Sequence, residues 1–358
     1  MDILSHLEEL LPILPPFALD RVERDEEKAE VHLYLTLPEP VIPEGYGVHS
    51  HYPRKWEHLK LFEYRCFIHC NLPIYHHKVT GELKKAEVSF SRDYSRFTLK
   101  YEAEVMRLLK IHHCFTKVGK TLGIYPQRVE HIYHHYTTDY QDNELRKVPV
   151  RIAYDETSTR KGHEYITTFY DFDTQKIVGI YEGKSSDCVY QFMQDHPYPE
   201  AVEELSLDMS PAFIKGARLY FPQARLTFDR WHVVKLLFKH LDNLEEKAAK
   251  FHRLIRLVMK DLTVFYKNQN QELFRAQLAF IADFAQTQLG DNSITKTIQR
   301  YWDGIVNYPL SKVNNGVLEG INSKIQVIKR VARGFRSKQN FMKMIRFVFD
   351  KEQVQVIS

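Results

Sequence analysis

The sequence lacks most of the features that assign a chain to a specialised class. None of its 358 residues lies in an apolar run approaching the ~20 residues of a membrane-spanning helix. We expect no signal peptide, because Asp2, Glu8 and Glu9 stand where such a peptide has basic residues. Four cysteines without a CxxC pair are typical of a reducing cytoplasm and argue against a disulfide scaffold. The composition that remains, 44% hydrophobic and 27% charged, is that of a globular protein with two or three domains.

The formal net charge of +4 hides an uneven distribution along the chain. Residues 1–30 form an acidic leader with nine acids and three bases. From Gly320 to Phe349 there is no acid, and the eight cations of this block indicate either a phosphate-binding surface or a solvated helix face. These cations are Lys324, Lys329, Arg330, Arg333, Arg336, Lys338, Lys343 and Arg346.

The N-terminal part after the leader has the pattern of a small β-rich module spanning residues 31–99. Short apolar runs bounded by turn residues predict strands rather than helices. We expect these strands at Val31–Leu37, Leu59–Phe67, Phe67–Leu72 and, after a Thr80-Gly81 turn, Glu87–Phe90.

Residues 100–140 change to a helical period and then to the spacing of a helix-turn-helix domain. A helix over Tyr101–Ile111 is followed by Gly119, where close helix packing needs a small residue, and by Gly123 at the turn. Pro126 suits the first turn of the second helix. The expected buried positions are Val118, Leu122, Ile124, Val129 and Ile132. The side chains expected to face a DNA groove are Gln127, Arg128, His131 and His135. Helix pairs of this outline also occur as purely structural hairpins.

From residue 148 onward the pattern predicts an α/β fold: three antiparallel strands, then alternating helices and two parallel strands. This order is that of an RNase H-like mixed sheet. We assign residues 148–231 to the first part of this core, 232–312 to a helical insertion and 313–350 to the last core helices. The expected elements are strands Val148–Tyr154, Tyr165–Phe172 and Lys176–Tyr181, a helix from Asp187 to Glu204, strand Leu205–Asp208, helix Pro211–Phe221, strand Ala224–Asp229 and a last helix from near Val317.

Three acids occupy special positions in this pattern. Asp155 is expected to end the first strand and Asp208 the fourth, and these strands are neighbours in the proposed sheet. Glu319 opens the last helix, on the face opposite the apolar stripe that includes Ile321 and Ile325. We therefore expect the three carboxylates to meet at one edge of the sheet.

Carboxylates brought together in this way repel each other, so one of them would stay protonated. Mg²⁺, or Mn²⁺ in its place, prefers oxygen ligands and turns that repulsion into a binding site. Two such ions activate a water or a 3′-hydroxyl and stabilise the leaving oxygen of an in-line phosphoryl displacement. The alternative is that each acid is a helix cap or turn residue, as Asp208 would be before Pro211.

Asp229 is a rival for the second catalytic acid. It also ends a predicted strand, and His232 follows three residues later. Asp229 could instead cap the helix that follows it. We consider Asp208 the better candidate. We expect Asp229 and His232 to contact the metal-binding residues, without binding the metal themselves, or to contact DNA.

Four segments resemble bacterial insertion-sequence transposases of the DDE type, most closely the ISL-three family. They are Ala153–Glu156, Leu205–Phe213, Thr227–Lys235 and Asn315–Lys324, the last running into Lys329–Phe335. The resemblance implies that Asp155, Asp208 and Glu319 are the catalytic triad and hold two Mg²⁺ ions. It also implies a helical insertion before the glutamate and a dimer or higher oligomer on DNA.

The N-terminus departs from the family pattern, whose members often begin with a zinc ribbon of two CxxC knuckles. The first knuckle is absent, and only Cys66 and Cys70 remain of the second. His49, His51 and His69 lie near them in sequence and could take the place of the missing cysteines, although His-rich β modules more often only pack. We expect a degenerate ribbon that does not bind zinc.

The sequence thus predicts a cytoplasmic, nucleoid-associated DNA transposase that acts on double-stranded DNA without a membrane partner. Arg160 and Lys161, expected in the loop after Asp155, and the basic block with Lys324, Lys329, Arg330, Arg333 and Arg336 would hold the DNA backbone. Two alternatives stay open: a helix-turn-helix DNA-binding protein without catalytic activity, and an RNase H-like nuclease or resolvase that cuts without joining.

Overall fold

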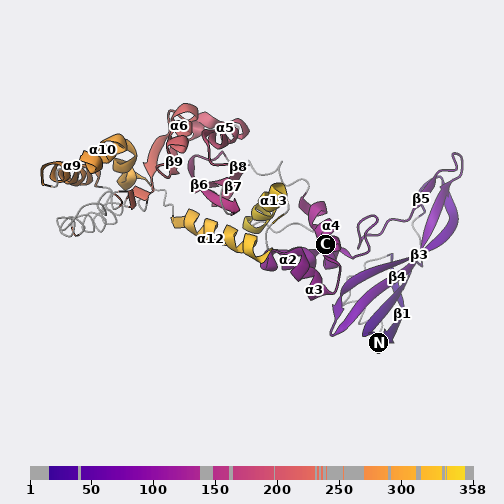
Figure 1. Ribbon diagram of the computed structural model, residues 1–358. Coiled ribbons are helices and arrows are strands. Elements are labelled where there is room, and N and C mark those ends of the chain that lie inside the picture. The colour runs from indigo at the N-terminus through magenta and orange to yellow at the C-terminus, as the bar shows by residue number, and fades with distance from the viewer. Residues whose placement is uncertain are drawn as a thin grey trace. The chain divides into compact units, whose positions relative to one another are not determined.

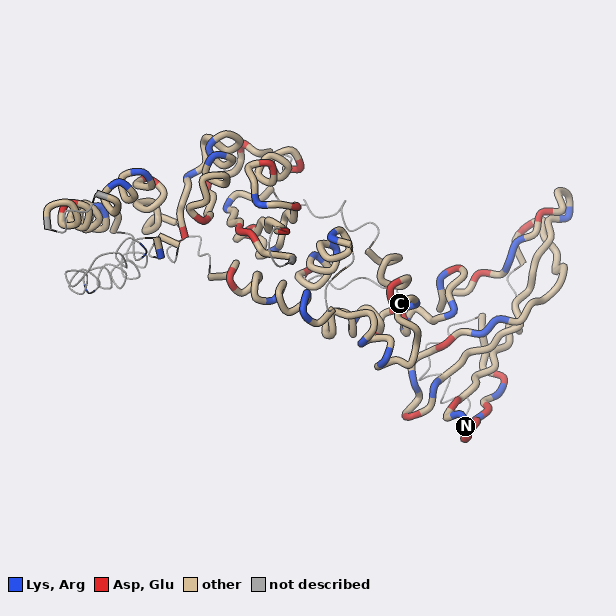
Figure 2. The backbone as a smooth tube through the Cα atoms, in the orientation of Figure 1, with Lys and Arg blue, Asp and Glu red and all other residues tan. Residues whose placement is uncertain are grey.

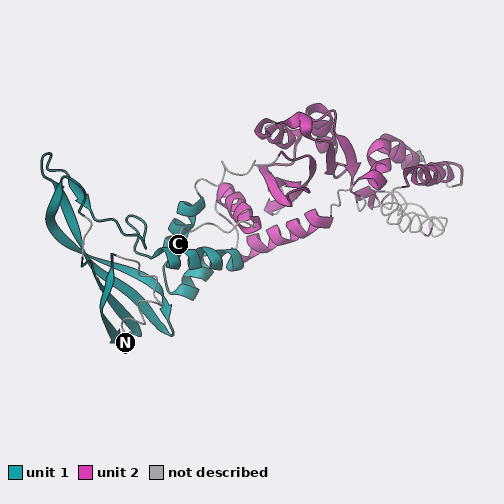
Figure 3. Ribbon diagram, turned by 180° about the vertical axis from the view of Figure 1, so that it is seen from behind, with its two compact units in different colours: residues 1–138, 352–358 teal, residues 139–351 magenta. Residues whose placement is uncertain are grey.

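The structure is a computed structural model, and its described residues form two compact units, one up to residue 138 and one from 139 to 351 (Figure 3). The described ranges are 16–38, 42–137, 148–160, 164–196, 198–229, 270–288, 292–311, 316–332 and 337–350, with isolated positions 232, 233, 235, 236, 239, 253 and 335. Within these ranges, no helix combines the length and apolarity needed to cross a membrane.

The first unit is built on one sheet (Figure 1). Its strands are β1 (Ala18–Asp25), β2 (Glu30–Thr36), β3 (Tyr46–Leu61), β4 (Tyr64–His77) and β5 (Leu83–Lys85). They lie in the order β1, β2, β4, β3, and β5 pairs with the last part of β4. β2 and β4 are parallel and the other pairs antiparallel. Alternate residues such as Leu33, Trp56 and Ile68 bury one face of the sheet in an apolar core.

This module differs from the predicted one in three places. β1 lies inside residues 1–30, for which the sequence predicted an acidic leader and no strand, and Arg21 pairs there with Glu23. The predicted strand Leu59–Phe67 is wrong, because the chain reverses at Phe62, whose φ is +54°, and β3 and β4 form a hairpin around it. Residues 87–90 are not a strand, and β5 takes residues 83–85 instead.

Among the described residues of the first unit, the helices are α2 (Leu99–His112), α3 (Phe115–Leu122) and α4 (Pro126–Thr137). The Thr98 side chain caps α2 by accepting from the Tyr101 amide at 3.3 Å. α3 ends at Gly123, which has φ +73°. A Cβ on Gly119 would lie 2.7 Å from the Ile124 carbonyl oxygen, so close packing at this point requires glycine.

The second unit contains a sheet of order β10-β9-β6-β7-β8. Its strands are β6 (Arg151–Arg160), β7 (Glu164–Asp171), β8 (Lys176–Glu182), β9 (Glu204–Leu207) and β10 (Arg225–Phe228). β6, β7 and β8 are antiparallel, and β9 runs parallel to both β6 and β10. This confirms the predicted strand order, in which the first and fourth strands are neighbours.

The apolar core of the second unit lies between this sheet and its helices (Figure 1). The helical elements are α5 (Ser186–Asp195), η1 (Pro199–Ala201), α6 (Pro211–Tyr220), α9 (Gln271–Gln288), α10 (Asn292–Arg300), α11 (Trp302–Val306), η2 (Tyr308–Leu310), α12 (Gly316–Val331) and α13 (Lys338–Phe349). α5 ends at Asp195 rather than continuing to Glu204, because Pro197 and Pro199 interrupt the helical sequence. Most of the predicted insertion before residue 270 lies outside the described residues.

Candidate active site

The pairing of β6 with β9 brings Asp155 and Asp208 to neighbouring positions. Ile152 pairs with Leu205 and Ala153 with Ser206, so both acids lie two residues beyond the last parallel pair. Asp208 directly follows β9, as predicted. Asp155 does not end its strand, which is a correction: β6 continues to Arg160 because it pairs with β7 beyond the end of β9.

Glu156 joins these two acids. One oxygen each from Asp155, Glu156 and Asp208 lies within 4.8 Å of the other two. Within the described part of the chain this is the single group of three or more acids, histidines and cysteines so close together. Glu156 lies in one of the four segments that carry the family resemblance, but no role was predicted for it. The signal in the sequence that could have indicated one is its position next to Asp155.

The carboxylates are held only in part by hydrogen bonds from the protein. Asp155 Oδ1 accepts from the Glu156 amide at 2.9 Å, and Asp208 Oδ1 accepts from the Ser210 amide at 2.9 Å. The second bond is the turn contact expected from the alternative account of Asp208. Glu156 Oε2 is buried and has no hydrogen-bond partner among the described residues. A buried oxygen without a donor is costly, and a cation would satisfy it.

Burial raises the pKa of all three acids, and neighbouring acids add to the effect. Burial, then the charges of Glu156 and Asp208, raises the pKa of Asp155 to about 7. Burial and Asp208 raise the pKa of Glu156, and burial is the main cause of the raised pKa of Asp208. An all-oxygen, half-buried group of this kind fits a hard divalent cation such as Mg²⁺ or Mn²⁺.

α12 is attached to β6 by polar side chains next to this group. Asn322 Nδ2 donates to Asp155 Oδ2 at 2.8 Å, and the Thr157 hydroxyl donates to Asn322 Oδ1. Gln326 and Lys329 both donate to the Ser158 carbonyl, at 3.0 and 3.2 Å. Asn322 fixes the orientation of Asp155, a role that the sequence pattern did not indicate.

Glu319 is not part of the carboxylate group. It is exposed in the first turn of α12, one turn before Asn322. The apolar stripe predicted for this helix is buried, from Leu318 to Ile328. Glu319 therefore lies near the N-terminus of α12, the helix whose Asn322 contacts Asp155. Its role as a metal ligand stays a prediction.

Asp229 and His232 lie close to Asp208, because Asp229 is hydrogen-bonded to Leu207, the residue before Asp208. The Asp229 amide donates to the Leu207 carbonyl at 3.0 Å, and its carboxylate lies 3.9 Å from His232 Nδ1. The charge of Asp229 raises the pKa of Asp208 and that of His232 lowers it. This placement is compatible with the supporting role that the sequence argument gave the pair.

Cys66 and Cys70 are placed unfavourably for sharing a zinc ion. They lie four residues apart on β4, which separates their Cα atoms by about 13 Å in an extended strand. Both are free and buried in the core of the first unit. Burial raises the pKa of Cys66 to about 12 and that of Cys70 to about 11, which opposes the thiolate form that zinc binds.

The predicted DNA-contacting residues fall into three groups. On α4, Gln127, His131 and His135 are exposed and Arg128 is half-buried. On α12, Lys324 and Arg330 are exposed, while Lys329 is half-buried against β6; Lys and Arg recur along this helix (Figure 2). Arg160 belongs to β6 rather than to a loop, and its side chain, Lys161, Arg333 and Arg336 lie outside what the structure describes.

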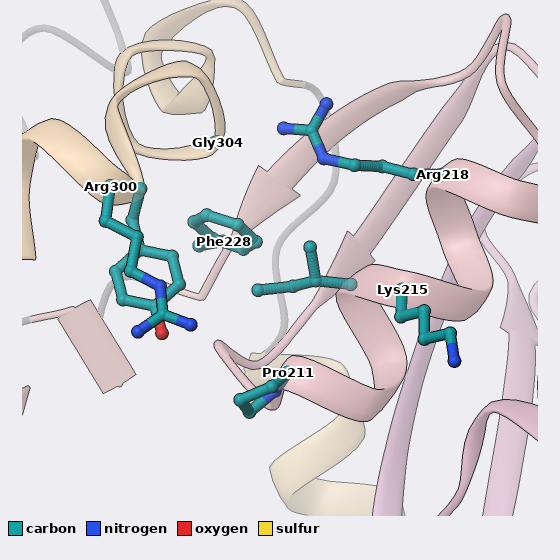
Figure 4. Close-up of a pocket in the computed structure, with 8 residues that line it drawn as sticks. Pro211, Lys215, Arg218, Phe228, Arg300 and Gly304 are labelled. Atoms are coloured by element: carbon teal, nitrogen blue, oxygen red, sulfur yellow. The ribbon is translucent and has the colours of Figure 1, made fainter.

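A cavity of about 210 Å³ lies between α6 and the segment around α11. The Phe228 ring lies between Arg300 on one side and Arg218 on the other (Figure 4). Arg218 lies 3.9 Å from the Asp303 carboxylate. A Cβ on Gly304 would lie 2.3 Å from the Phe228 ring, so glycine is required where α11 meets β10.

A mixed sheet of this order, with acids at adjacent strand positions, is consistent with the RNase H-like domain of a transposase. A family model described as transposase matches residues 152–272 and 249–345, together more than half of the chain. The chain belongs to this family, the ISL-three family of DDE transposases. It is also 24% identical over 245 residues to the transposase for insertion sequence element IS1001 from Bordetella parapertussis. That match covers 55% of this chain and 60% of the relative.

Proposed function

We propose that this protein binds the terminal inverted repeats of an insertion sequence and catalyses metal-dependent cleavage and transfer of DNA strands. The observation that carries the proposal is the group formed by Asp155, Glu156 and Asp208, whose oxygens lie within 4.8 Å of one another. These residues lie inside the matched transposase segment.

In this proposal Asp155 and Asp208 hold two Mg²⁺ ions, which Mn²⁺ can replace, and Glu319 supplies the third carboxylate. Glu156 is a further ligand candidate because its buried Oε2 has no donor among the described residues. Bound metal would activate a water or a 3′-hydroxyl and stabilise the leaving oxygen. Asn322 keeps Asp155 Oδ2 in a fixed position through its 2.8 Å hydrogen bond.

The remaining parts of the chain would bind and position double-stranded DNA. The exposed side chains Gln127 and His131 of α4 would contact a groove. Lys324 and Arg330 on α12 would contact backbone phosphates near the carboxylates. Because two ends have to be cut together, the active form would be a dimer or higher oligomer, in the cytoplasm and on the nucleoid.

The direct test uses duplexes that carry the end of the element encoding the chain, with Mg²⁺ or Mn²⁺. Asp155→Asn, Asp208→Asn and Glu319→Gln are each expected to abolish nicking and leave duplex binding intact. Glu200→Gln, an exposed acid outside the carboxylate group, is the matched control and is expected to keep full activity. Nicking by both aspartate variants at the wild-type rate would contradict the proposal.

A second assay separates the proposal from its two alternatives. A pre-cleaved end with a free 3′-hydroxyl is offered together with target DNA, and joined products are measured. Strand transfer is expected. A nuclease or resolvase would cut but give no joined product, and a catalytically inert DNA-binding protein would give neither nicks nor joined strands.

A further inference from the structure

A basic cavity in the first unit is separate from the carboxylate group. It has a volume of about 380 Å³ and is lined by parts of β3 and β4, the segment before α2, and α4. Five cationic side chains and one carboxylate line it: Arg54, Lys55, Arg65, Arg96, Arg128 and Glu57.

Backbone pairing at the edge of the sheet brings these residues together. β3 is an edge strand of its sheet, and residues 96–98 run alongside it. The Glu57 amide donates to the Arg96 carbonyl at 2.8 Å, and the Thr98 amide donates to the Glu57 carbonyl at 3.1 Å. Arg128 reaches the same place from α4, with its guanidinium carbon 6.0 Å from the centre of the Phe97 ring. Four segments of the chain (β3, β4, the segment before α2, and α4) therefore contribute cations to one cavity.

Only one of the five cations is neutralised inside the cavity. Glu57 is 7% exposed and accepts from Arg65 Nε at 3.1 Å and Nη2 at 2.9 Å, so these two charges compensate each other. Among the described residues, Arg54, Lys55, Arg96 and Arg128 form no ion pair with a carboxylate. Cations gathered without counter-charges repel one another, and an anion in the cavity relieves that repulsion.

Two of the four remaining cations are already oriented by neutral groups. Arg54 Nη2 donates to the Ser95 carbonyl at 2.9 Å. The Lys55 ammonium lies 3.8 Å from the centre of the Phe67 ring. Both contacts hold the side chain near the cavity without removing its charge.

We propose that this cavity binds a backbone phosphate of duplex DNA through Lys55, Arg96 and Arg128. The inference rests on the proposed function, because Arg128 follows Gln127 on the helix proposed to enter a groove. A phosphate bordering that groove would then be held by the β-rich module and the helix together. Such a contact fixes the position of the DNA without distinguishing its sequence.

The test measures duplex binding by fluorescence anisotropy over a range of salt concentrations, with an end duplex and a duplex of scrambled sequence. Lys55→Gln and Arg96→Gln are each expected to weaken binding about tenfold, equally for both duplexes. In a plot of the logarithm of the binding constant against the logarithm of the salt concentration, the slope is negative. Its magnitude should decrease by about 0.9 when the phosphate contact is lost. Lys60→Gln, an exposed lysine on the same strand outside the cavity, is the matched control and should change neither quantity.

A duplex with one neutral methylphosphonate locates the contact. At one position it should weaken wild-type binding by more than tenfold, because Lys55, Arg96 and Arg128 all lose their anion, and it should weaken the binding of Lys55→Gln by a smaller factor, because one of these contacts is already lost. Lys55→Arg, which keeps the charge, should restore binding, and thermal melts of each variant check that it is folded.

The possible failures are distinguishable. If wild type binds duplexes but Lys55→Gln and Arg96→Gln behave like Lys60→Gln, the phosphate cavity is wrong and the proposed function stands. If inorganic phosphate, followed by ³¹P NMR, occupies the cavity and duplex does not displace it, the cavity binds a free anion and the inference is overturned. If wild type binds neither duplex, the proposed function itself fails.

Discussion

At the scale of single residues, Asp155 carries an electrostatic cost in the folded state. Burial and then the charges of Glu156 and Asp208 outweigh the hydrogen bond from Asn322 and raise the pKa of the Asp155 carboxyl group to about 7. The usual pKa of an aspartate is about 3.9. The folded state therefore disfavours the charged form of Asp155, and removing that charge should stabilise the protein.

This predicts a pH-dependent effect of Asp155→Asn on stability when divalent cations are chelated. A raised carboxyl pKa costs nothing below the unfolded value of about 4, and the cost grows until the pH passes about 7. Asp155→Asn should be more stable than wild type by on the order of 1–3 kcal/mol at pH 8 and about equal near pH 4. Thermal melts in chelator measure this. A difference that is the same at both pH values would contradict it.

Asn322 is predicted to act as a positioning residue for Asp155. Its hydrogen bond lowers the pKa of that acid, so Asn322→Ala should move the acidic limb of the pH–rate profile for nicking to higher pH. The rate itself should fall about 10–100-fold. Gln326→Ala is the control, because Gln326 donates to the Ser158 carbonyl and touches none of the three acids. If both variants left the profile unchanged, Asn322 would be purely structural.

The sequence was sufficient to predict that Asp155 and Asp208 lie close together, because each follows a short apolar run and strand order brings these runs side by side. It was insufficient for Glu156 and Asn322. Both adjacent acids reach Asp208 through strand packing, and which residue of α12 reaches β6 depends on packing between residues 167 positions apart. Such contacts cannot be predicted from the local sequence pattern.

At the scale of elements, the packing of α3 against α4 depends on Gly119. A Cβ there would lie 2.7 Å from a backbone oxygen, which has no rotamer with which to move away. Gly119→Ala is therefore expected to destabilise the first unit by about 1–3 kcal/mol and to weaken duplex binding.

Gly320→Ala is the matched control for this prediction. Gly320 is exposed within α12, and a Cβ there would meet no atom within 4 Å. Alanine favours the helix by up to ~1 kcal/mol over glycine, so this variant should melt at an equal or higher temperature. Equal destabilisation by both substitutions would show that the contact with Ile124 is not the cause.

The predicted bounds of the strands agree with the structure where the sequence pattern is strongly apolar, and disagree with it where apolar and polar residues are mixed. β9 and β10 are almost fully buried and were predicted to within a residue or two. β3 alternates exposed and half-buried residues along much of its 16-residue length, and β1 is mostly exposed, so neither has a clear apolar run. Their pairing with neighbouring strands stabilises them.

At the scale of the whole molecule, the first unit is proposed to bind DNA through α4, and the second to hold the metal site and the DNA backbone next to it. The choice between Asp208 and Asp229 as the second catalytic acid belongs to this scale, because it decides which strand end the metal site uses. Asp208 belongs to the group within 4.8 Å, and Asp229 pairs with His232 instead. Asp229→Asn should keep most of the nicking activity and Asp208→Asn should lose it. The opposite result would exchange their roles.

The most direct test of the account is a calorimetric titration of the folded protein with Mn²⁺. We expect wild type and Glu200→Gln to bind Mn²⁺, and Asp155→Asn and Asp208→Asn to lose most of that binding while keeping the same far-ultraviolet circular dichroism. Mn²⁺ binding of undiminished affinity in both aspartate variants would contradict the assignment of these carboxylates to a metal site, and with it the proposed chemistry.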